Sequence, residues 1–576
     1  MTQRRTRVLA VATAAVVALT VAGTQSGAVA GGRGGQSHPH GHGHGHGPGH
    51  GSVDRPSKVV IIVVDSLSKE IVEQYDMRNV EALMKDGVDS PRSYLGHTGS
   101  VTVVTHNVIT SGQLPQHMGW TDEGYRDVAG VLGDPEPTNP DQLYITSNAT
   151  TDLFKLQQAA GYPKLADYLG TADPSAKTFT ISPKGYAGYA FGGAGSDSII
   201  TFGSGPECTT GGSWRKPTGI NVPSYILGEP CSRFWVHSGY PTFAYDTAKL
   251  PAILYPLDSD RYVTGKDPAH QGGDVWAADA AVAVMRNEAS WNGIFVTLPG
   301  VDKAAHMWGG TSDPGPTGTD GDPMTHLAAA TAEADRQVGK IMGELEAQGV
   351  LDDTLVVLTA DHGSVAGKTF YGKEVAERDY GYYNWYYGDP ENDGVYDRPQ
   401  DALLPLVNTG NVGLSYSDSM LRVWLKDQSP AKVDEAATAM GTMAGVTAVW
   451  RRDGDHYDRV SPVRWERMRS WGERVWFASK AQELVDTQAA DYGPDLIATL
   501  PDDTTYSVKG DHGGIQRAAQ QIPIVFAGGG LSSKDLRAEV RSVDIMPTIL
   551  RAMGIQATYP MDGIAYELPV RKRGRH

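Results

Sequence analysis

The chain has 576 residues, of which 40% are hydrophobic and 20% charged, and its formal net charge is -17. This composition is typical of a globular protein with a large core. The acidic balance excludes a nucleic-acid backbone as the main partner, because such binding depends on Lys and Arg. It is compatible with a small anionic substrate if metal ions supply local positive charge.

The N-terminus has the pattern of a cleaved secretory signal peptide. A basic start precedes an apolar run over residues 8–21, and Ala28, Val29 and Ala30 end the segment with small side chains. We expect cleavage after Ala30, which removes residues 1–30. The apolar run is short for a membrane span, and no later stretch is long enough for an anchor. The sequence therefore predicts a secreted protein without a membrane anchor.

Residues 31–57 form a Gly/His-rich segment with almost no apolar side chain to bury, so we expect disorder there. Its histidines either collect borderline metal ions or are incidental to a flexible tether, and both interpretations stay open. A flexible segment cannot hold the fixed geometry of a catalytic site. Cys208 and Cys231 are the two cysteines of the chain. We expect them to form a disulfide after export, with two buried thiols as the alternative.

The expected catalytic domain covers residues 58–565. Unbroken Val/Ile runs bounded by polar residues predict strands buried on both faces of a parallel sheet. They lie at residues 58–64, 178–182, 293–300, 354–363 and 522–530. Helical periodicity alternates with these runs, most clearly over residues 325–349, where Gly349 is a stop signal. The alternation predicts an α/β fold, a three-layer sandwich with a mostly parallel central sheet, whose ligands bind beyond the C-terminal ends of the strands.

Two segments interrupt this alternation, at about residues 203–275 and 371–505. We interpret them as insertions that form a cap over the pocket rather than as separate domains. The second opens with an aromatic cluster that includes Tyr383 and Trp385. These rings either pack or bind substrate, by stacking on a base or caging a quaternary ammonium group. Residues 566–576 are expected to form a solvated basic tail.

Carboxylates and imidazoles gather at the predicted strand ends. Taken singly, each has a structural explanation, such as a helix cap or a satisfied loop histidine. Together they are the ligand set that two zinc ions would need. The six candidates are Asp65, Asp302, His306, Asp361, His362 and His512. Asp302 and His306 are four residues apart, so one helical turn would place them on the same side. Asp361 and His362 lie in "ADHG", and His512 lies in "GDHGG".

These motifs in this order resemble the alkaline phosphatase superfamily, nearest to its nucleotide pyrophosphatase/phosphodiesterase branch. In that branch a nucleophilic Thr follows the first strand's Asp. Thr102 lies 37 residues after Asp65, four before His106 and ten before Gly112, which matches that context. The resemblance covers most of residues 57–565, and the two insertions match poorly.

The resemblance implies a Thr102 nucleophile, a covalent phosphoryl intermediate and two divalent metal ions, most simply Zn²⁺. Ser100 and Thr105 remain alternative nucleophiles, and His106 is expected to support the helix. One implied metal has Asp302, His306 and His512 as ligands, and the other has Asp65, Asp361, His362 and the Thr102 oxygen.

One position departs from the branch. Where its members carry an Asn that donates a hydrogen bond to the phosphoryl oxygen, this sequence has Glu123 beside Asp122. A carboxylate facing developing negative charge is unfavourable unless it is protonated, turned away or paired with a cation. We therefore list Glu123 as a substrate-binding candidate that puts the substrate class in question.

The sequence thus predicts a secreted, metal-dependent hydrolase of small phosphate esters, similar to phosphodiesterases. A phosphomonoesterase, a phosphonate or sulfate-ester hydrolase of the same superfamily, and a non-catalytic zinc-binding protein are the alternatives. The usual sulfatase route is disfavoured because no Cys or Ser lies in the Cys/Ser-x-Pro-x-Arg context that yields formylglycine.

Overall fold

The computed structural model describes residues 55–133, 143–145, 151–201, 214–215, 217–227, 229–230, 273–308, 323–365, 369–370, 373–374, 404–506 and 510–571. Its largest feature is an eight-stranded sheet. In spatial order the strands are β2 (Val88–Asp89), β20 (Ile524–Gly528), β11 (Thr354–Thr359), β1 (Lys58–Val64), β10 (Trp291–Leu298), β5 (Lys177–Ser182), β6 (Ser198–Thr201) and β8 (Thr218–Ile220).

Strand β1 lies in the middle of this sheet and pairs in parallel with β10 and β11. Residues 59–64 are fully buried, as expected for a Val/Ile run covered on both faces. All five predicted strands are present. Strand β20 runs antiparallel to β11, and β8 runs antiparallel to β6, so the sheet is mostly parallel rather than wholly so. A short apolar run fixes burial but not strand direction, because direction depends on the connection before it.

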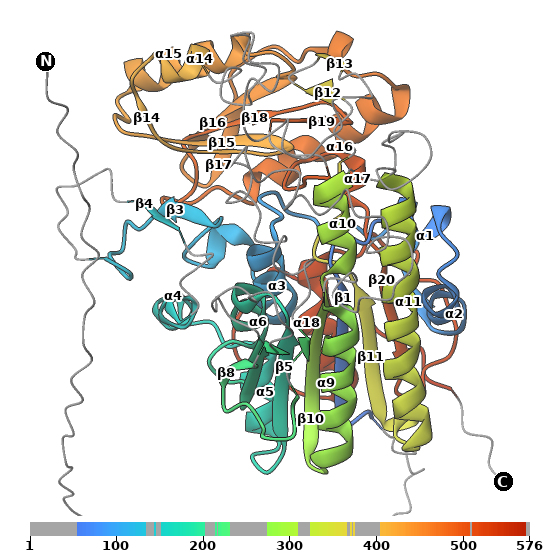
Figure 1. Cartoon of the computed structure of the whole chain (residues 1–576). Helices are drawn as coiled ribbons and strands as arrows, with labels where there is room; N and C mark the ends of the chain where they lie inside the picture. The colour runs from blue at the N-terminus through green and yellow to red at the C-terminus, as the bar shows by residue number, and fades with distance from the viewer. Residues whose placement is uncertain are drawn as a thin grey trace, which may run out of the picture. The chain divides into compact units, whose positions relative to one another are not determined.

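Helices cover both faces of the sheet, which gives the predicted three layers (Figure 1). One layer contains α2 (Arg78–Asp86), α9 (Asp274–Asn287) and α11 (Pro323–Ala347), and the other contains α3 (Thr102–Ser111), α5 (Leu165–Ala172), α6 (Gly185–Gly192) and α18 (Ile545–Met553). Helix α11 ends just before Gly349, whose φ of +69° is the left-handed conformation that the predicted stop signal requires. None of the helices in the described ranges is long and apolar enough to cross a membrane.

The described part of the second insertion forms an antiparallel sheet of five strands. In spatial order these are β14 (Val412–Ser417), β15 (Met420–Leu425), β18 (Leu496–Thr499), β16 (Ala448–Asp453) and β17 (His456–Arg459). Helices α15 (Pro430–Thr442) and α16 (Trp471–Asp486) each contribute to one of two separate apolar clusters around this sheet. The insertion therefore has its own core.

This insertion packs on the main sheet at the edge where the strands of the parallel set end. Trp424 of β15 lies in one apolar cluster with Val103 and Val104 of α3. At the β14–β15 turn, the Ser419 N–H donates to the His512 carbonyl oxygen at 3.3 Å, and the Ser419 hydroxyl accepts from the Gly514 N–H at 2.8 Å. The loop that carries His512 is thus held by the insertion.

Several expectations fall on residues outside the described ranges. These are the signal peptide, the Gly/His-rich segment up to Asp54, Cys208 and Cys231, Tyr383 and Trp385, and most of the first insertion. The basic tail lies outside from residue 572 onward.

Candidate active site

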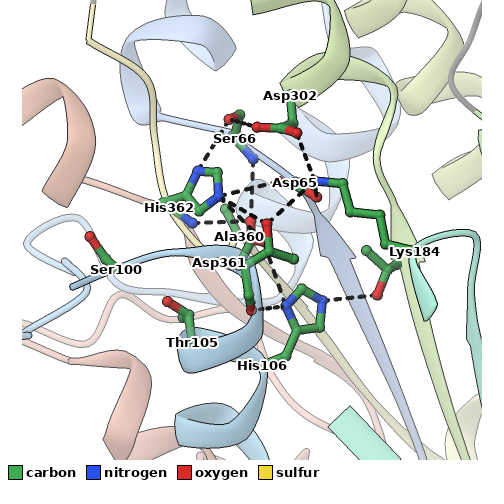
Figure 2. Close-up of polar contacts among 12 residues, drawn as sticks. Asp65, Ser66, Ser100, Thr105, His106, Lys184, Asp302, Ala360, Asp361 and His362 are labelled. Atoms are coloured by element: carbon green, nitrogen blue, oxygen red, sulfur yellow. Dashed lines mark hydrogen bonds and ion pairs between the residues drawn. The ribbon is translucent and has the colours of Figure 1, made fainter. Parts of the chain in front are cut away.

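The C-terminal ends of neighbouring strands bring together the carboxylates that the sequence singled out. Asp65 follows β1, and Asp361 follows β11, which pairs with β1 in parallel register. Asp302 lies in the first turn of α10 (Gly300–Trp308), directly after β10. All three are buried, and Figure 2 shows them around one centre. His306 lies in the same helix α10, and its side chain is outside the described residues.

His362 lies between these carboxylates. Its Nε2 atom is 3.4 Å from Asp65 Oδ1 and 3.6 Å from Asp361 Oδ2. The His362 ring stacks on the His512 ring at a centroid distance of 3.4 Å and an interplanar angle of 14°. Two imidazoles are therefore in direct contact, although 150 residues of sequence separate them in the chain.

The two ring nitrogens of His512 face different neighbours. His512 Nδ1 lies 3.1 Å from the Ser100 carbonyl oxygen. A carbonyl oxygen can only accept, so Nδ1 carries the proton and Nε2 keeps its lone pair. That Nε2 atom lies 3.9 Å from Asp302 Oδ1. This is the arrangement by which proteins commonly orient a metal-ligating histidine.

The geometry fits metal ions in two overlapping groups of ligand atoms. Within each group the atoms lie within 4.8 Å of one another, and the groups are Asp65, Asp361 and His362, and Asp302, His362 and His512. Asp65 Oδ1 and Asp361 Oδ2 are buried and accept no hydrogen bond from the described residues. Burial, followed by the charges of Asp302 and Asp361, raises the pKa of Asp65 well above its usual range, and burial raises the pKa of Asp361 to about 6. Such crowded carboxylates favour a bound cation.

The turn after β11 is sterically tight. A Cβ atom on Gly363 would lie 1.9 Å from the Ala518 carbonyl oxygen and 2.9 Å from Ser68 Cβ. The Gly363 N–H donates to the Ala519 carbonyl oxygen at 2.9 Å, which holds the turn against that segment. The absence of a side chain at Gly363 therefore lets Asp361 and His362 leave the strand toward the same centre.

Thr102 occupies the first position of α3, with its hydroxyl toward this centre. Thr102 Oγ1 lies 3.4 Å from His362 Nε2. One turn further, His106 Nδ1 lies 2.7 Å from the Thr102 carbonyl oxygen, and Nε2 lies 2.9 Å from the Thr297 hydroxyl. Both ring nitrogens of His106 thus have protein partners, which agrees with its expected role as a support of the helix.

The two alternative nucleophiles lie in other surroundings. The Ser100 hydroxyl is buried and has no hydrogen-bond partner among the described residues, while its carbonyl oxygen faces His512. The Thr105 hydroxyl faces His97 Nε2 at 3.4 Å. In Figure 2 neither hydroxyl contacts the carboxylates. The geometry therefore favours Thr102.

Lys184 is a site residue that the sequence analysis missed. It caps α6 directly after β5, and its Nζ atom lies 2.6 Å from both Asp65 Oδ2 and Asp302 Oδ2 and 3.3 Å from Thr102 Oγ1. Burial disfavours its charged form, but Asp302 and Asp65 outweigh burial and raise the pKa of Lys184 well above its ordinary value. The signal was present in the sequence, because Lys184 follows a predicted strand just as Asp65 does.

Ser66 is a second missed residue. It adopts a φ of +68°, which is uncommon for a residue other than glycine. This conformation turns its hydroxyl to Asp302 Oδ1 at 3.1 Å and to His362 Nδ1 at 3.2 Å. Ser66 therefore links two candidate metal ligands, which no local sequence pattern announced.

Glu123 lies after the nucleophile helix in a buried charged environment. Burial and the neighbouring Asp122 raise the pKa of Glu123 to about 7, and the charges of Lys184 and Arg422 oppose this shift. Of the three conditions given for a carboxylate at this position, a nearby cation is provided by Lys184 and Arg422, whose charges act on Glu123.

The layered sheet and its edge of carboxylates and imidazoles place the chain in the alkaline phosphatase class of α/β folds. Two solved structures have a similar fold. The alkaline phosphatase PafA matches with a TM-score of 0.55 at 15% sequence identity, and a variant of PafA matches with a TM-score of 0.57 at 14% identity. Each match covers 88% of this chain and 97% of the PafA chain. The family model for type I phosphodiesterase / nucleotide pyrophosphatase matches residues 59–519. The chain belongs to this family of phosphate-ester hydrolases.

Two curated relatives are alkaline phosphatases. PhoK of Sphingomonas sp. is 22% identical over 335 residues, 54% of this chain and 55% of that protein. PhoD of Zymomonas mobilis subsp. mobilis is 22% identical over 343 residues, 56% of this chain and 54% of that protein. The chain thus spans about half the length of the curated relatives it matches.

Proposed function

We propose that this chain is a secreted hydrolase of small phosphate esters that uses Thr102 as its nucleophile beside two divalent metal ions. The observation that carries the proposal is the convergence of the Thr102 hydroxyl, the Lys184 ammonium group and the buried carboxylates at one sheet edge. Lys184 and the carboxylates follow different strands of the sheet, and Thr102 begins α3.

The metal ligands would be those named above. Asp65, Asp361 and His362 would hold one ion, with the Thr102 oxygen, and Asp302 and His512 would hold the other, together with His306. Zn²⁺ suits this mixture of carboxylate and imidazole donors. When bound, the ions supply positive charge for the transferred phosphoryl group and favour the ionised form of a nearby hydroxyl.

Thr102 is placed to attack phosphorus. It lies at the N-terminus of α3, a helix of ten residues whose first N–H groups favour an anion. In the first step the Thr102 Oγ–P bond forms, the bond from phosphorus to the ester oxygen breaks, and the alcohol leaves with a proton. In the second step water attacks phosphorus, the Oγ–P bond breaks, and Thr102 regains its proton as phosphate or a monoester departs.

Lys184 would neutralise the phosphoryl oxygens during both steps. Its Nζ atom is within hydrogen-bond distance of the Thr102 hydroxyl, so a phosphoryl group on that oxygen would lie beside the ammonium charge. The same contact favours a second candidate function, hydrolysis of phosphomonoesters, because their phosphoryl group carries an additional negative charge.

The test uses the purified full chain loaded with zinc. Turnover of bis-p-nitrophenyl phosphate and of p-nitrophenyl phosphate is measured for the wild type, Thr102→Ala and Ser100→Ala. We expect turnover that disappears with a chelator and with Thr102→Ala, and that persists in Ser100→Ala. Loss with Ser100→Ala but not with Thr102→Ala would overturn the assignment of the nucleophile.

Rapid acid quenching with a phosphorus-32 substrate gives a second readout. We expect label on the wild-type protein and none on Thr102→Ala. Secretion is tested by the N-terminal residue of the exported protein, which should be Gly31 if cleavage follows Ala30.

A further inference from the structure

Four charged side chains cluster between the insertion and the segment of the candidate nucleophile, and we call them the acidic cluster: Asp122, Asp418 and Arg422, which are buried, and Glu123, which is partly buried. Arg422 lies on β15 and is fully buried. Its Nε atom pairs with Asp122 Oδ2. Its two terminal nitrogens lie 3.2 Å and 2.5 Å from the two carboxylate oxygens of Asp418. One guanidinium group thus holds two carboxylates, and Glu123 directly follows the first.

The acidic cluster touches both loops that carry site residues. A Cβ atom on Gly99, three residues before Thr102, would lie 3.4 Å from Asp122 Oδ2. Asp418 leaves no room for a side chain at Gly513, next to His512. The Gly99 N–H donates to the Gly513 carbonyl oxygen at 3.0 Å, so the two loops are joined at this point. Two buried carboxylates of the cluster therefore lie against the loops that carry Thr102 and His512.

Glu123 interacts electrostatically with a residue of this centre. Its carboxylate lies within electrostatic range of Lys184, whose Nζ atom is 3.3 Å from Thr102 Oγ1. Burial raises the pKa of Tyr186, the charge of Lys184 opposes this shift, and the charge of Glu123 adds to it. On the other side, Gly124 packs on the Tyr416 ring, and the position of a Cβ there would lie 3.3 Å from the Tyr416 hydroxyl. This packing fixes the backbone beside Glu123.

The balance of charge in the acidic cluster is negative. The acidic cluster has three carboxylates and one guanidinium group, which pairs with Asp122 and Asp418. Burial raises the pKa of Asp122 to about 6, and burial with Asp122 raises that of Glu123 to about 7. Above these values the acidic cluster presents excess negative charge to the space that a phosphoryl group would occupy, and Lys184 offsets part of it.

We infer that Glu123 is a specificity-determining residue that makes the site favour the monoanionic phosphoryl group of a diester over the dianionic phosphoryl group of a monoester. The inference deepens the proposed function and rests on it. A fixed carboxylate repels a dianion more than a monoanion, because the interaction is proportional to the product of the charges. The partial burial of Glu123 strengthens this difference, since water screens the interaction less than at the surface. Lys184 keeps the phosphoryl group bound, and Glu123 sets which charge state is preferred.

The experiment compares kcat/KM for bis-p-nitrophenyl phosphate and p-nitrophenyl phosphate in the wild type and Glu123→Gln, at about pH 9, where both the carboxylate and the monoester are fully ionised. We expect the monoester-to-diester ratio to rise about tenfold in Glu123→Gln. Arg422→Met, which removes the compensating charge, should lower the same ratio. If that variant does not fold, Asp122→Asn takes its place and should raise the ratio.

The matched control is the substitution Glu473→Gln. Glu473 is a buried residue of the second insertion, which also carries Arg422. Its carboxylate accepts hydrogen bonds from the backbone N–H groups of Arg469 and Asp502, away from the site. This substitution should leave the ratio unchanged even if it lowers the melting temperature. A ratio in Glu123→Gln within about twofold of the wild-type value, or below it, would overturn the inference.

Binding of inorganic phosphate to the zinc-loaded protein, measured by calorimetry at the same pH, separates this inference from the proposed function. Absence of turnover in the wild type would refute the proposed function alone, because phosphate is a dianion whose binding needs no turnover. Tighter phosphate binding by Glu123→Gln would still support the charge selection, and unchanged binding would refute it.

Discussion

Replacing Gly363 by alanine is a direct test of how the strand end builds the site. The new Cβ atom would lie 1.9 Å from the Ala518 carbonyl oxygen, whereas ordinary contact begins at 3.4 Å, so one of the two backbones has to move by about 1.5 Å. The obstacle is backbone on one side and Ser68 Cβ on the other, so no flexible side chain can give way. Asp361 and His362 directly precede Gly363 and must move with it.

We expect two effects of different size. Overpacking of this kind costs about 1–3 kcal/mol of unfolding free energy. A displacement of about 1 Å in a positioned catalytic group costs about 10²-fold in rate, so kcat/KM should fall at least that far. The zinc content after dialysis should fall below the wild-type value, because two ligands of the proposed site leave their places.

The assay measures zinc by atomic absorption, kcat/KM with bis-p-nitrophenyl phosphate, and urea denaturation for wild type and variant. Gly441→Ala is the matched control, because no atom lies within 4 Å of the Cβ it would add in α15. That variant should be about 0.5–1 kcal/mol more stable and fully active. Gly363→Ala with unchanged zinc content and turnover within about threefold would refute the steric argument.

Three further predictions address the nucleophile, the metal ions and a buried amine. Thr102→Ser keeps a hydroxyl and should retain turnover within about tenfold, whereas Thr102→Ala should lose about 10³-fold or more, as stopped assays with matched metal content will measure. Dialysis against a chelator should abolish turnover and lower the melting temperature, and added zinc should restore both; a chelated protein of unchanged melting temperature would contradict a site built from buried carboxylates. Lys164 is fully buried, donates to Asn107 Oδ1 at 3.0 Å on the nucleophile helix, and has its pKa lowered to about 7 by burial. The unfolded chain binds the additional proton between that value and 10.5, so stability should rise with pH across this window, and urea denaturation of Lys164→Met should show a flatter dependence.

Local sequence patterns were sufficient for the framework of this fold. Val/Ile runs identify strands because a strand covered on both faces has no polar position, and parallel strands end at one edge. The strand pattern therefore also predicts the shared C-terminal edge of the sheet. Each of the residues predicted there lies directly after a strand or in the next helical turn: Asp65, Asp302, Asp361 and His362. The pairing of Thr102 with this edge came from motif order in a resemblance, since nothing in the local pattern "SVTVVTH" distinguishes its hydroxyl from that of Ser100 or Thr105.

Which charged side chains pair with each other was determined only by the tertiary structure. Lys184 contacts Asp302, which lies 118 residues away in the sequence. Arg422 of the second insertion pairs with Asp122, which follows the nucleophile helix in the chain. A charged residue carries no periodic signal of its partner, because attraction depends on distance in space and on burial, which arise only when distant segments pack. The antiparallel direction of β20 depends on the connection before that strand, and neither this direction nor the left-handed turn at Ser66 had a local signal in the sequence. Unbroken apolar runs thus determined the strands and their shared edge, whereas the charge environment of the candidate nucleophile was determined by packing.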